Sequence, residues 1–349
     1  MSASDPLLPW RVTAFGSASD RVIGAILLFG SARAQFHPQC LHIALSGWVR
    51  RIPTLCARSI MLTIQNLTKV YPPDLVAVDD VSIRLKQGVV GLIGHNGAGK
   101  TSLINMIATL VGPTRGRILF DDYDIVRQPE RIRRRLGFLP QEFGAHNNLT
   151  AHDFLRYLAA LKGVRDAGRM RRCLEMVNLH EFAQRRLSEF SGGMRRRLGI
   201  AQALLNDPDV LIVDEPTTGL DLDERLRFRM LMAQVGLDRL VLISTHIVSD
   251  IENVASRLVI MHKGKLVAAA SPHELMAQAR GKIWSALVDT GDYSALRTRM
   301  QILQARQQAG GMQLRIAHPH SPFPGAQSEE PSLEDALMAY PHASSEQAA

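Results

Sequence analysis

Cysteine and long apolar runs are scarce in this sequence of 349 residues. The three cysteines, Cys40, Cys56 and Cys173, have neither metal-ligand spacing nor the even number of a disulfide framework, which favours a reducing compartment. The longest apolar run, Val22 to Gly30, has nine residues, whereas a helix needs about 20 to cross a bilayer. If the protein works at a membrane, we expect a partner to supply the membrane-spanning part.

The basic charge is unevenly distributed and lacks the aromatic residues of a nucleic-acid site. The formal net charge is +8, and half of it belongs to residues 1–60, which contain six Arg, two Asp and no Lys. The arginine runs at 131–135 and 195–197 have no interleaved aromatic side chains on which bases could stack. We interpret both runs as solvated helix faces and expect no nucleic-acid partner.

Apolar periodicity predicts an α/β fold after residue 60. A helix is expected after Gly94, with Leu103, Ile104, Ile107 and Leu110 on one face, and residues 151–205 are mostly helical in pattern. Strands are expected at 62–64, 81–85, 89–93, 117–120, 137–139, 210–213, 240–244, 258–261 and 265–268. Strands that alternate with helices predict a largely parallel sheet covered by helices, with the 151–205 segment as a separate lobe.

The C-terminal segment predicts a small α+β accessory domain. After Ala270 we expect strands at 283–288 and 312–316, a helix at 293–308, a loop rich in Pro, Ser and Gly at 318–331, and a short helix at 332–340. The expected domains are therefore an extension at 1–60, a main domain at 61–275 with a helical lobe at about 142–207, and an accessory region at 276–349 that ends in a flexible tail.

A phosphate-loop motif, GHNGAGKT, spans Gly94 to Thr101. Its glycines allow backbone N–H groups to point at phosphate oxygens, and the N-terminus of the following helix adds its dipole. Lys100 is placed to reach the β- and γ-phosphates, and the Thr101 hydroxyl is placed to bind Mg²⁺.

Polar residues end two of the predicted strands. Asp214 and Glu215 follow the apolar run at 210–213, and Thr245 and His246 follow the run at 240–244. Ligands gather at the carboxyl ends of strands in an open parallel sheet, so these side chains are expected near the phosphate loop. Asp214 is then placed to hold Mg²⁺, and Glu215 to polarise water for attack on the γ-phosphate.

Ser191, Gly192 and Gly193 open another predicted helix. The N-terminus of this helix is either a second anion cradle or an ordinary capped helix end, and the motif alone does not decide between the two.

From Met61 to about Ala270 the chain resembles the ATP-binding cassette domains of transporters, with the motifs in the same order. Tyr71 resembles the aromatic residue that stacks on adenine, and Gln141 the switch glutamine that touches Mg²⁺. Residues 190–194 (FSGGM) resemble the family signature, residues 219–221 the loop that crosses the dimer, and His246 the switch histidine. His95 stands where Pro is commoner, and Phe190 and Met194 replace the usual Leu and Gln.

The resemblance implies a P-loop NTPase (RecA-like) fold with a parallel-sheet core, an antiparallel β subdomain and a helical subdomain. It implies an ATPase with ATP and Mg²⁺ as cofactors, in which the catalytic residues are Lys100, Gln141, Glu215 and His246. The implied metal ligands are Thr101, Gln141 and Asp214. The implied nucleotide-binding residues are Tyr71, Gly94, His95, Asn96, Gly97, Ala98, Gly99, Lys100, Thr101, Ser102, Ser191, Gly192, Gly193 and Asp221.

The resemblance also implies partners: a second cassette, as a homodimer, and integral membrane permease subunits at the cytoplasmic face of the cell membrane. Residues 331–337 (PSLEDAL) are similar to the C-terminal end of cassettes that serve exporters, which favours export. One alternative is a soluble cassette ATPase that acts on DNA or ribosomes, but the 90-residue spacing between phosphate loop and signature is too short for the coiled coil of the DNA-repair relatives. A non-hydrolysing regulator is the other alternative, and Glu215 and His246 argue against it.

Residues 1–60 contain two of the three Trp and two of the three Cys, and their periodicity is poor. Arg21 before an apolar stretch and the 32–34 segment (ARA) are compatible with a signal peptide, but secretion would remove the protein from ATP. A membrane-surface arm is a second possibility. We favour an extension that lies outside the main fold.

Overall fold

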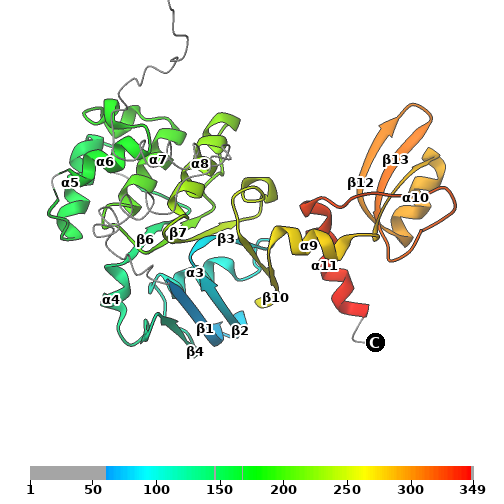
Figure 1. The fold of residues 1–349 in the computed structure, drawn as a ribbon, viewed down its shortest axis with the longest axis horizontal. Helices are drawn as coiled ribbons and strands as arrows, with labels where there is room; N and C mark the ends of the chain where they lie inside the picture. Colours follow the sequence, from blue (N-terminus) through cyan, green and yellow to red (C-terminus); the bar gives the residue numbers. More distant parts are fainter. Residues whose placement is uncertain (1–59, 145–146, 167, 347–349) are drawn as a thin grey trace, which may run out of the picture. The chain divides into compact units, whose positions relative to one another are not determined.

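The computed structural model describes residues 60–144, 147–166 and 168–346 (Figure 1). The predictions for the extension therefore fall outside the described residues, except for Ile60, which is buried.

Two sheets form the frame of the main domain, as predicted. The first is antiparallel, with the order β2-β1-β4-β5. Its strands are β1 (Met61–Tyr71), β2 (Leu75–Lys86), β4 (Arg115–Phe120) and β5 (Tyr123–Asp124). The second has the order β10-β9-β3-β8-β7-β6, and all its neighbouring pairs are parallel except β10 with β9. Its strands are β3 (Gly88–Ile93), β6 (Leu136–Leu139), β7 (Val210–Asp214), β8 (Leu240–Thr245), β9 (Arg257–His262) and β10 (Lys265–Ala270).

Helix α3 (Lys100–Ile107) contributes to the core that joins the two sheets. Its Ile104 and Ile107 are fully buried in one apolar cluster with Leu62 of β1 and Leu92 of β3. The helix is shorter than predicted. It ends before Thr109, whose positive φ of 60° breaks the helix, and Leu110 is 62% exposed rather than part of the buried face.

The predicted helical lobe is present, and its helices pack on the other face of the parallel sheet. Its elements are α5 (Ala151–Leu161), α6 (Arg169–Met176), η2 (His180–Phe182), η3 (Leu187–Glu189) and α7 (Gly192–Ala203). A second apolar cluster unites this lobe with α8 (Leu222–Val235), through residues such as Leu155, Leu198 and Met232. The short helices α4 (Pro129–Arg133) and η4 (Val248–Asp250) lie in connections.

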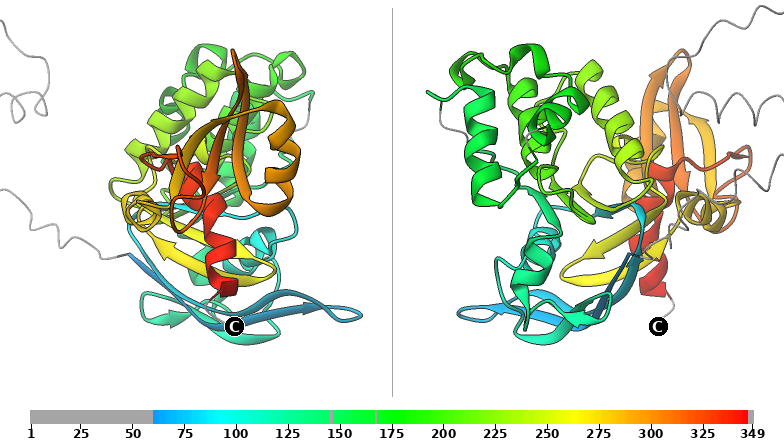
Figure 2. Two further views of the ribbon diagram at one scale, coloured as in Figure 1. Left: turned by 90° about the vertical axis from the view of Figure 1, so that its right-hand side faces the viewer. Right: turned by 60° about the vertical axis from the view of Figure 1, so that its left-hand side comes forward.

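The C-terminal region is α+β as predicted, with one wrong element (Figure 2). The predicted helix at 293–308 is instead α10 (Thr290–Arg299) followed by β12 (Gln301–Gln308). Met300 is extended, and β12 forms a hairpin with β13 (Gly311–Ala317). Gly310 and Gly311 turn this hairpin at φ values of 96° and 145°, which few other residues adopt.

The remaining elements of this region are α9 (Pro272–Ala279), β11 (Ile283–Val288), β14 (Gln327–Ser328) and α11 (Leu333–Glu346). The sheet order is β12-β13-β11-β14, and α11 packs on α9. Helix α11 continues six residues beyond the predicted end at Tyr340, into the segment that was expected to be a flexible tail.

The interpretation of the two arginine runs as solvated faces is wrong for several of their members. Arg135 forms ion pairs with Asp121 and Asp209. Arg197 pairs with Glu224 at 3.1 Å, and Arg196 donates its hydrogen bonds to main-chain carbonyl groups. These side chains hold loops in place, because buried main-chain acceptors and carboxylates need donors that water cannot supply there.

Candidate functional site

The phosphate loop connects β3 to α3, as predicted, and its glycines have steric reasons to be there. Gly97 and Gly99 have positive φ values of 80° and 98°. A Cβ at Gly94 would lie 2.6 Å from the carbonyl oxygen of Met261, and one at Gly99 would lie 2.2 Å from that of Ala77. The loop can therefore keep this path only without side chains at these positions.

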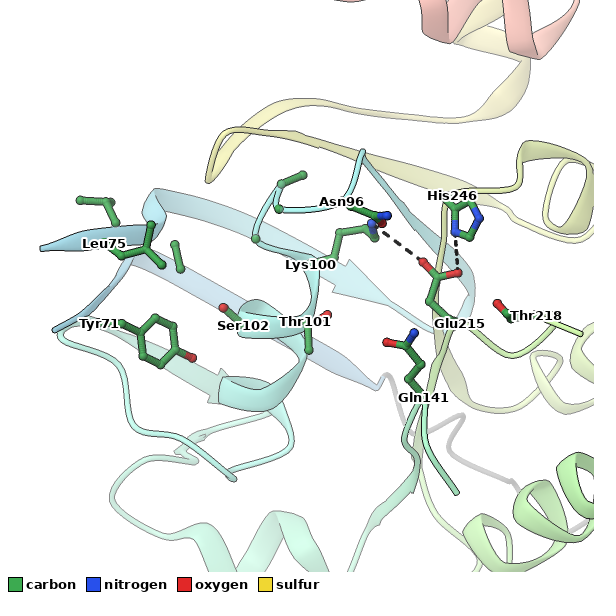
Figure 3. Close-up of a pocket in the computed structure, with 15 residues that line it drawn as sticks. Tyr71, Leu75, Asn96, Lys100, Thr101, Ser102, Gln141, Glu215, Thr218 and His246 are labelled. Carbon is green, nitrogen blue, oxygen red and sulfur yellow. Dashed lines mark hydrogen bonds and ion pairs between the residues drawn. The ribbon is translucent and has the colours of Figure 1, made fainter. Parts of the chain in front are cut away.

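A pocket of about 420 Å³ opens beside this loop (Figure 3). The residues predicted from the sequence that line it are Tyr71, Asn96, Gly97, Ala98, Gly99, Lys100, Thr101, Ser102, Gln141, Glu215 and His246. They come from the phosphate loop after β3, from the start of α3, and from the ends of β1, β6, β7 and β8. The rule that ligand-binding groups collect at the carboxyl ends of parallel strands accounts for this convergence.

Lys100 is buried at the floor of the pocket. Its ammonium group donates to the carbonyl oxygens of Gly94 at 2.6 Å and His95 at 3.3 Å, and it lies 3.9 Å from Oε1 of Glu215. Burial lowers the pKa of Lys100 from its ordinary value, while the nearby carboxylates of Glu215 and Asp214 act in the opposite direction. This cation faces the pocket where a phosphate anion would bind.

Glu215 and His246 form a pair on the wall of the pocket opposite Tyr71 (Figure 3). Nδ1 of His246 lies 2.8 Å from Oε2 of Glu215. Glu215 is 8% exposed, and its backbone has a positive φ of 46°, which is uncommon outside glycine. The imidazole can fix the direction of the carboxylate, which is the arrangement that a general base requires.

Asp214 lies beside the pocket rather than among its lining residues. Its carboxylate accepts a hydrogen bond from the Ser244 hydroxyl, and the side chain is buried. Mg²⁺ prefers oxygen ligands and commonly binds through one or two carboxylates together with substrate phosphates. The Thr101 hydroxyl, the Gln141 amide oxygen and the Asp214 and Glu215 carboxylates form such a set, so these residues fit Mg²⁺.

The remaining predicted residues do not line this pocket. Gly94 and His95 hold Lys100 through their carbonyl groups, while Ser191, Gly192, Gly193 and Asp221 lie elsewhere. Ser191 caps α7 by accepting from the Met194 amide, and Asp221 caps α8 by accepting from the Glu224 amide. In the single chain, Ser191 therefore acts as an ordinary helix cap.

Four lining residues were missed by the sequence analysis. Leu75, Val76 and Ala77 begin β2 directly across the turn from Tyr71, and Thr218 follows Glu215 by three residues. Leu75 and Val76 are 65% and 48% exposed, which is high for apolar residues. The apolar start of a strand next to a candidate adenine-stacking residue is the signal that could have identified them.

Comparison with known proteins identifies the family. The model of the family described as ABC transporter matches residues 78–218. The chain is 34% identical over 212 residues to the ABC transporter ATP-binding protein NatA of Bacillus subtilis (strain 168), which covers 59% of this chain and 86% of NatA. This chain is an ABC transporter ATP-binding protein.

Other relatives of this ABC transporter ATPase agree with the assignment. The bacitracin transport ATP-binding protein BcrA of Bacillus licheniformis is 37% identical over 212 residues, covering 60% of this chain and 69% of BcrA. A solved structure described as the ATP-binding subunit of an ABC transporter is 30% identical with a TM-score of 0.57, covering 62% of this chain and 92% of that chain. The dimeric bacterial cassette MJ0796 is 26% identical with a TM-score of 0.56, covering 60% and 98%.

The protein is therefore the ATP-hydrolysing subunit of an ABC transporter, as predicted. Among the residues that the structure describes, no helix is long and apolar enough to cross a membrane.

Proposed function

We propose that this ATPase works as a homodimer that binds two MgATP molecules and drives export through separate membrane subunits. The observation that carries the proposal is the division of the motifs. Lys100, Gln141, Glu215 and His246 share one pocket, whereas Ser191 and Gly192 cap a helix outside it. Because the signature lies outside the pocket of its own chain, it is available to bind the nucleotide of a second chain. The similar cassette MJ0796 is described as dimeric.

In this proposal each side chain has one role. Tyr71 stacks on the adenine, and main-chain N–H groups of the phosphate loop, together with the Lys100 ammonium, bind the phosphates. Glu215, oriented by His246, accepts a proton from the attacking water. Bound Mg²⁺, held by Thr101, Gln141 and Asp214, would neutralise charge on the β- and γ-phosphates.

The signature completes the site from the second subunit. The first N–H groups of α7 have no partners within the helix, so they can donate to a γ-phosphate presented by the other chain. Asp221 begins α8 at the same kind of helix N-terminus. The two cassettes would then close when a γ-phosphate is present and separate once it has been hydrolysed.

Export is favoured by the relatives, among them the Nod factor export ATP-binding protein I of Cupriavidus metallidurans, which is 36% identical over 224 residues. We further propose that the cassette spans residues 61–275 with the accessory region at 276–349, and that the protein is peripheral to the cytoplasmic face of the membrane. Purification together with an integral membrane protein supports this placement, whereas purification with ribosomes or DNA favours the alternative.

The variant Glu215→Gln tests the mechanism. The amide keeps the size of the side chain but cannot accept the proton, so turnover is expected to fall by about 10²–10⁴-fold. ATP binding should persist, and size-exclusion chromatography with MgATP should show a trapped dimer. The matched control is Glu181→Gln, because the Glu181 side chain is exposed on the helical lobe. A Glu215→Gln variant that stays monomeric with ATP and hydrolyses it at the wild-type rate would contradict the proposal.

A further inference from the structure

Arg196 in α7 has all of its hydrogen-bond donors directed at main-chain carbonyl oxygens. Its Nε donates to Pro216 at 3.0 Å. Its Nη1 donates to Pro140 at 3.2 Å and Gln141 at 2.8 Å. Its Nη2 donates to Asp214 at 2.7 Å and Glu215 at 2.6 Å. A guanidinium group has five N–H donors, so each donor has one acceptor.

The acceptors belong to the two loops that carry the reacting groups. Pro140 and Gln141 follow β6, and Asp214, Glu215 and Pro216 end β7 or follow it. One side chain therefore joins the loop of the candidate Mg²⁺ ligand Gln141 to the loop of the candidate base Glu215. A movement of either loop would break at least two hydrogen bonds to the same group.

The main chain at Glu215 needs such support. A non-glycine residue at positive φ is strained, and the strained conformation persists only where the surrounding structure holds it. The Glu215 amide donates to the Ser244 carbonyl at 3.1 Å, and its own carbonyl accepts from Arg196. The amide and the carbonyl of Glu215 are thus both held by hydrogen bonds, and its carboxylate lies 2.8 Å from Nδ1 of His246.

Arg196 also belongs to the helix that begins with the signature. It lies five residues after Ser191, less than two turns along α7. We propose that Arg196 is a positioning residue for ATP hydrolysis, which fixes the backbone of Gln141 and Glu215 and ties both loops to the signature helix. This inference rests on the proposed roles of Gln141, Glu215 and Ser191.

Lysine cannot replace Arg196 in this role. An ammonium group has three donors at one point, and the five acceptors are spread over two loops. The guanidinium group also remains charged although burial lowers its pKa, with the carboxylates of Asp214 and Glu215 acting in the opposite direction. We therefore expect a planar, five-donor group to be required, rather than a positive charge alone.

The chain offers a matched control in Arg169. This arginine likewise donates to main-chain carbonyl groups, those of Leu204 and Leu205, and pairs with Asp207. Its side chain is 16% exposed, but its acceptors belong neither to the Gln141 loop nor to the Glu215 loop. Arg169→Gln therefore reports what the loss of a half-buried, carbonyl-binding arginine does to stability alone.

The experiment compares Arg196→Gln, Arg196→Lys and Arg169→Gln in the full chain. Turnover and KM for MgATP are measured per folded protein, with folding checked by thermal unfolding, and dimer formation with MgATP is followed by size-exclusion chromatography. We expect both Arg196 variants to lose about 10–100-fold in kcat, because small misplacements of reacting groups have effects of that size. KM should change less than about threefold, and slow hydrolysis should let the ATP-bound dimer accumulate as in Glu215→Gln. Arg169→Gln should be less stable with nearly unchanged kcat.

Two results would overturn the inference. One is an Arg196→Gln variant with wild-type kcat per folded protein. The other is a loss of kcat that Arg169→Gln shares in proportion to its loss of stability, since this identifies a structural role only. Failure of the proposed function gives a different result: if Glu215→Gln does not form a dimer with ATP, the dimer proposal is wrong, while the comparison of kcat with KM still decides the role of Arg196.

Discussion

Two lysines of this ATPase that have a lowered pKa differ in their surroundings. Lys100 has two carboxylates nearby, whereas Lys162 in the helical lobe donates to the carbonyl of Gln202 at 2.9 Å and to Asn206 at 3.2 Å. Desolvation of its ammonium group lowers the pKa of Lys162 from 10.5 to about 8, although the residue as a whole is exposed, and the charge of Cys173 acts in the opposite direction. The fold therefore disfavours the charged form of Lys162, whereas the two carboxylates favour the charged form of Lys100.

The pKa of Lys162 predicts a pH-dependent stability. Between pH 8 and 10.5 the unfolded state binds more protons at this residue than the folded state, so stability rises with pH in that window. Lys162→Met should remove this contribution, which solvent screening at the exposed Lys162 limits to about 1 kcal/mol or less in the free energy of unfolding between pH 7 and pH 10. Urea unfolding at both pH values measures it, with the exposed Lys86→Met as control. Equal pH dependence in the wild type and Lys162→Met would contradict the shift.

Single residues of the site were predictable where a simple rule applies to them. Glu215 and His246 were found because each follows an apolar strand, and such strand ends meet at one edge of a parallel sheet. Arg196 could not be found in this way. Its role depends on two loops that lie 55 and about 20 residues away in sequence, and an arginine run by itself favours a solvated face.

At the scale of elements, helix α11 is held by an ion-pair network around Arg315. This arginine donates to Asp335 at 2.7 Å, and also contacts Glu329 and the Glu330 carbonyl. Burial would raise the pKa of Asp335, but hydrogen bonds from Arg315 and Ser332 outweigh it and lower the pKa below its usual value. The charged carboxylate is therefore a stabilising group at neutral pH.

Asp335→Asn should destabilise the C-terminal region at pH 7 by about 1–3 kcal/mol, because it removes one of the two carboxylates that pair with Arg315. The stabilisation is present above the unfolded pKa of 3.8 and is lost as pH falls through the lower folded pKa. Thermal unfolding should hence separate wild type from variant at pH 7, and less so near pH 3. Exposed Glu334→Gln is the control. A difference that grows on acidification would show that the network is wrongly described.

Elements were predictable to different extents in the two parts of the chain. The buried strands β3, β7 and β8 are apolar except at the carboxyl ends of β7 and β8, and that pattern indicates buried strands of a parallel sheet. Strand β12 was mistaken for helix because its sequence, QILQARQQ, has few apolar residues and its side chains are mostly exposed or half-buried. Its structure depends on pairing with β13, which lies later in the chain.

For the whole molecule, the proposed dimer predicts complementation between two inactive variants. Lys100→Ala removes phosphate binding, and Gly192→Asp adds a negative charge at the signature. A mixture should recover part of the activity that each homodimer lacks, because one composite site of the heterodimer combines two intact halves. Steady-state ATPase assays of the separate and mixed proteins measure this.

The structure favours Gly192 over Gly193 for this test. A Cβ at Gly193 would lie 3.1 Å from the Glu224 carboxyl carbon, so an aspartate there would act on its own chain. A Cβ at Gly192 meets no heavy atom within 4 Å. If the mixture is as inactive as its components, the signature does not act across a dimer.

The apolar start of β2 has a consequence for the choice among nucleobases. In the proposed nucleotide site, Tyr71, Leu75 and Val76 would offer a ring face and aliphatic carbon to the base, and apart from the Tyr71 hydroxyl these side chains have no group to read its polar edge. Discrimination by such a surface is weak, because it leaves no buried donor or acceptor unpaired when the base changes. GTP should therefore be hydrolysed with kcat/KM within about tenfold of that for ATP. Parallel assays with both nucleotides measure the ratio, and a preference of several hundredfold for ATP would require a base-reading group outside these three residues. The transporter would then draw on purine triphosphates in general, in proportion to their cellular concentrations.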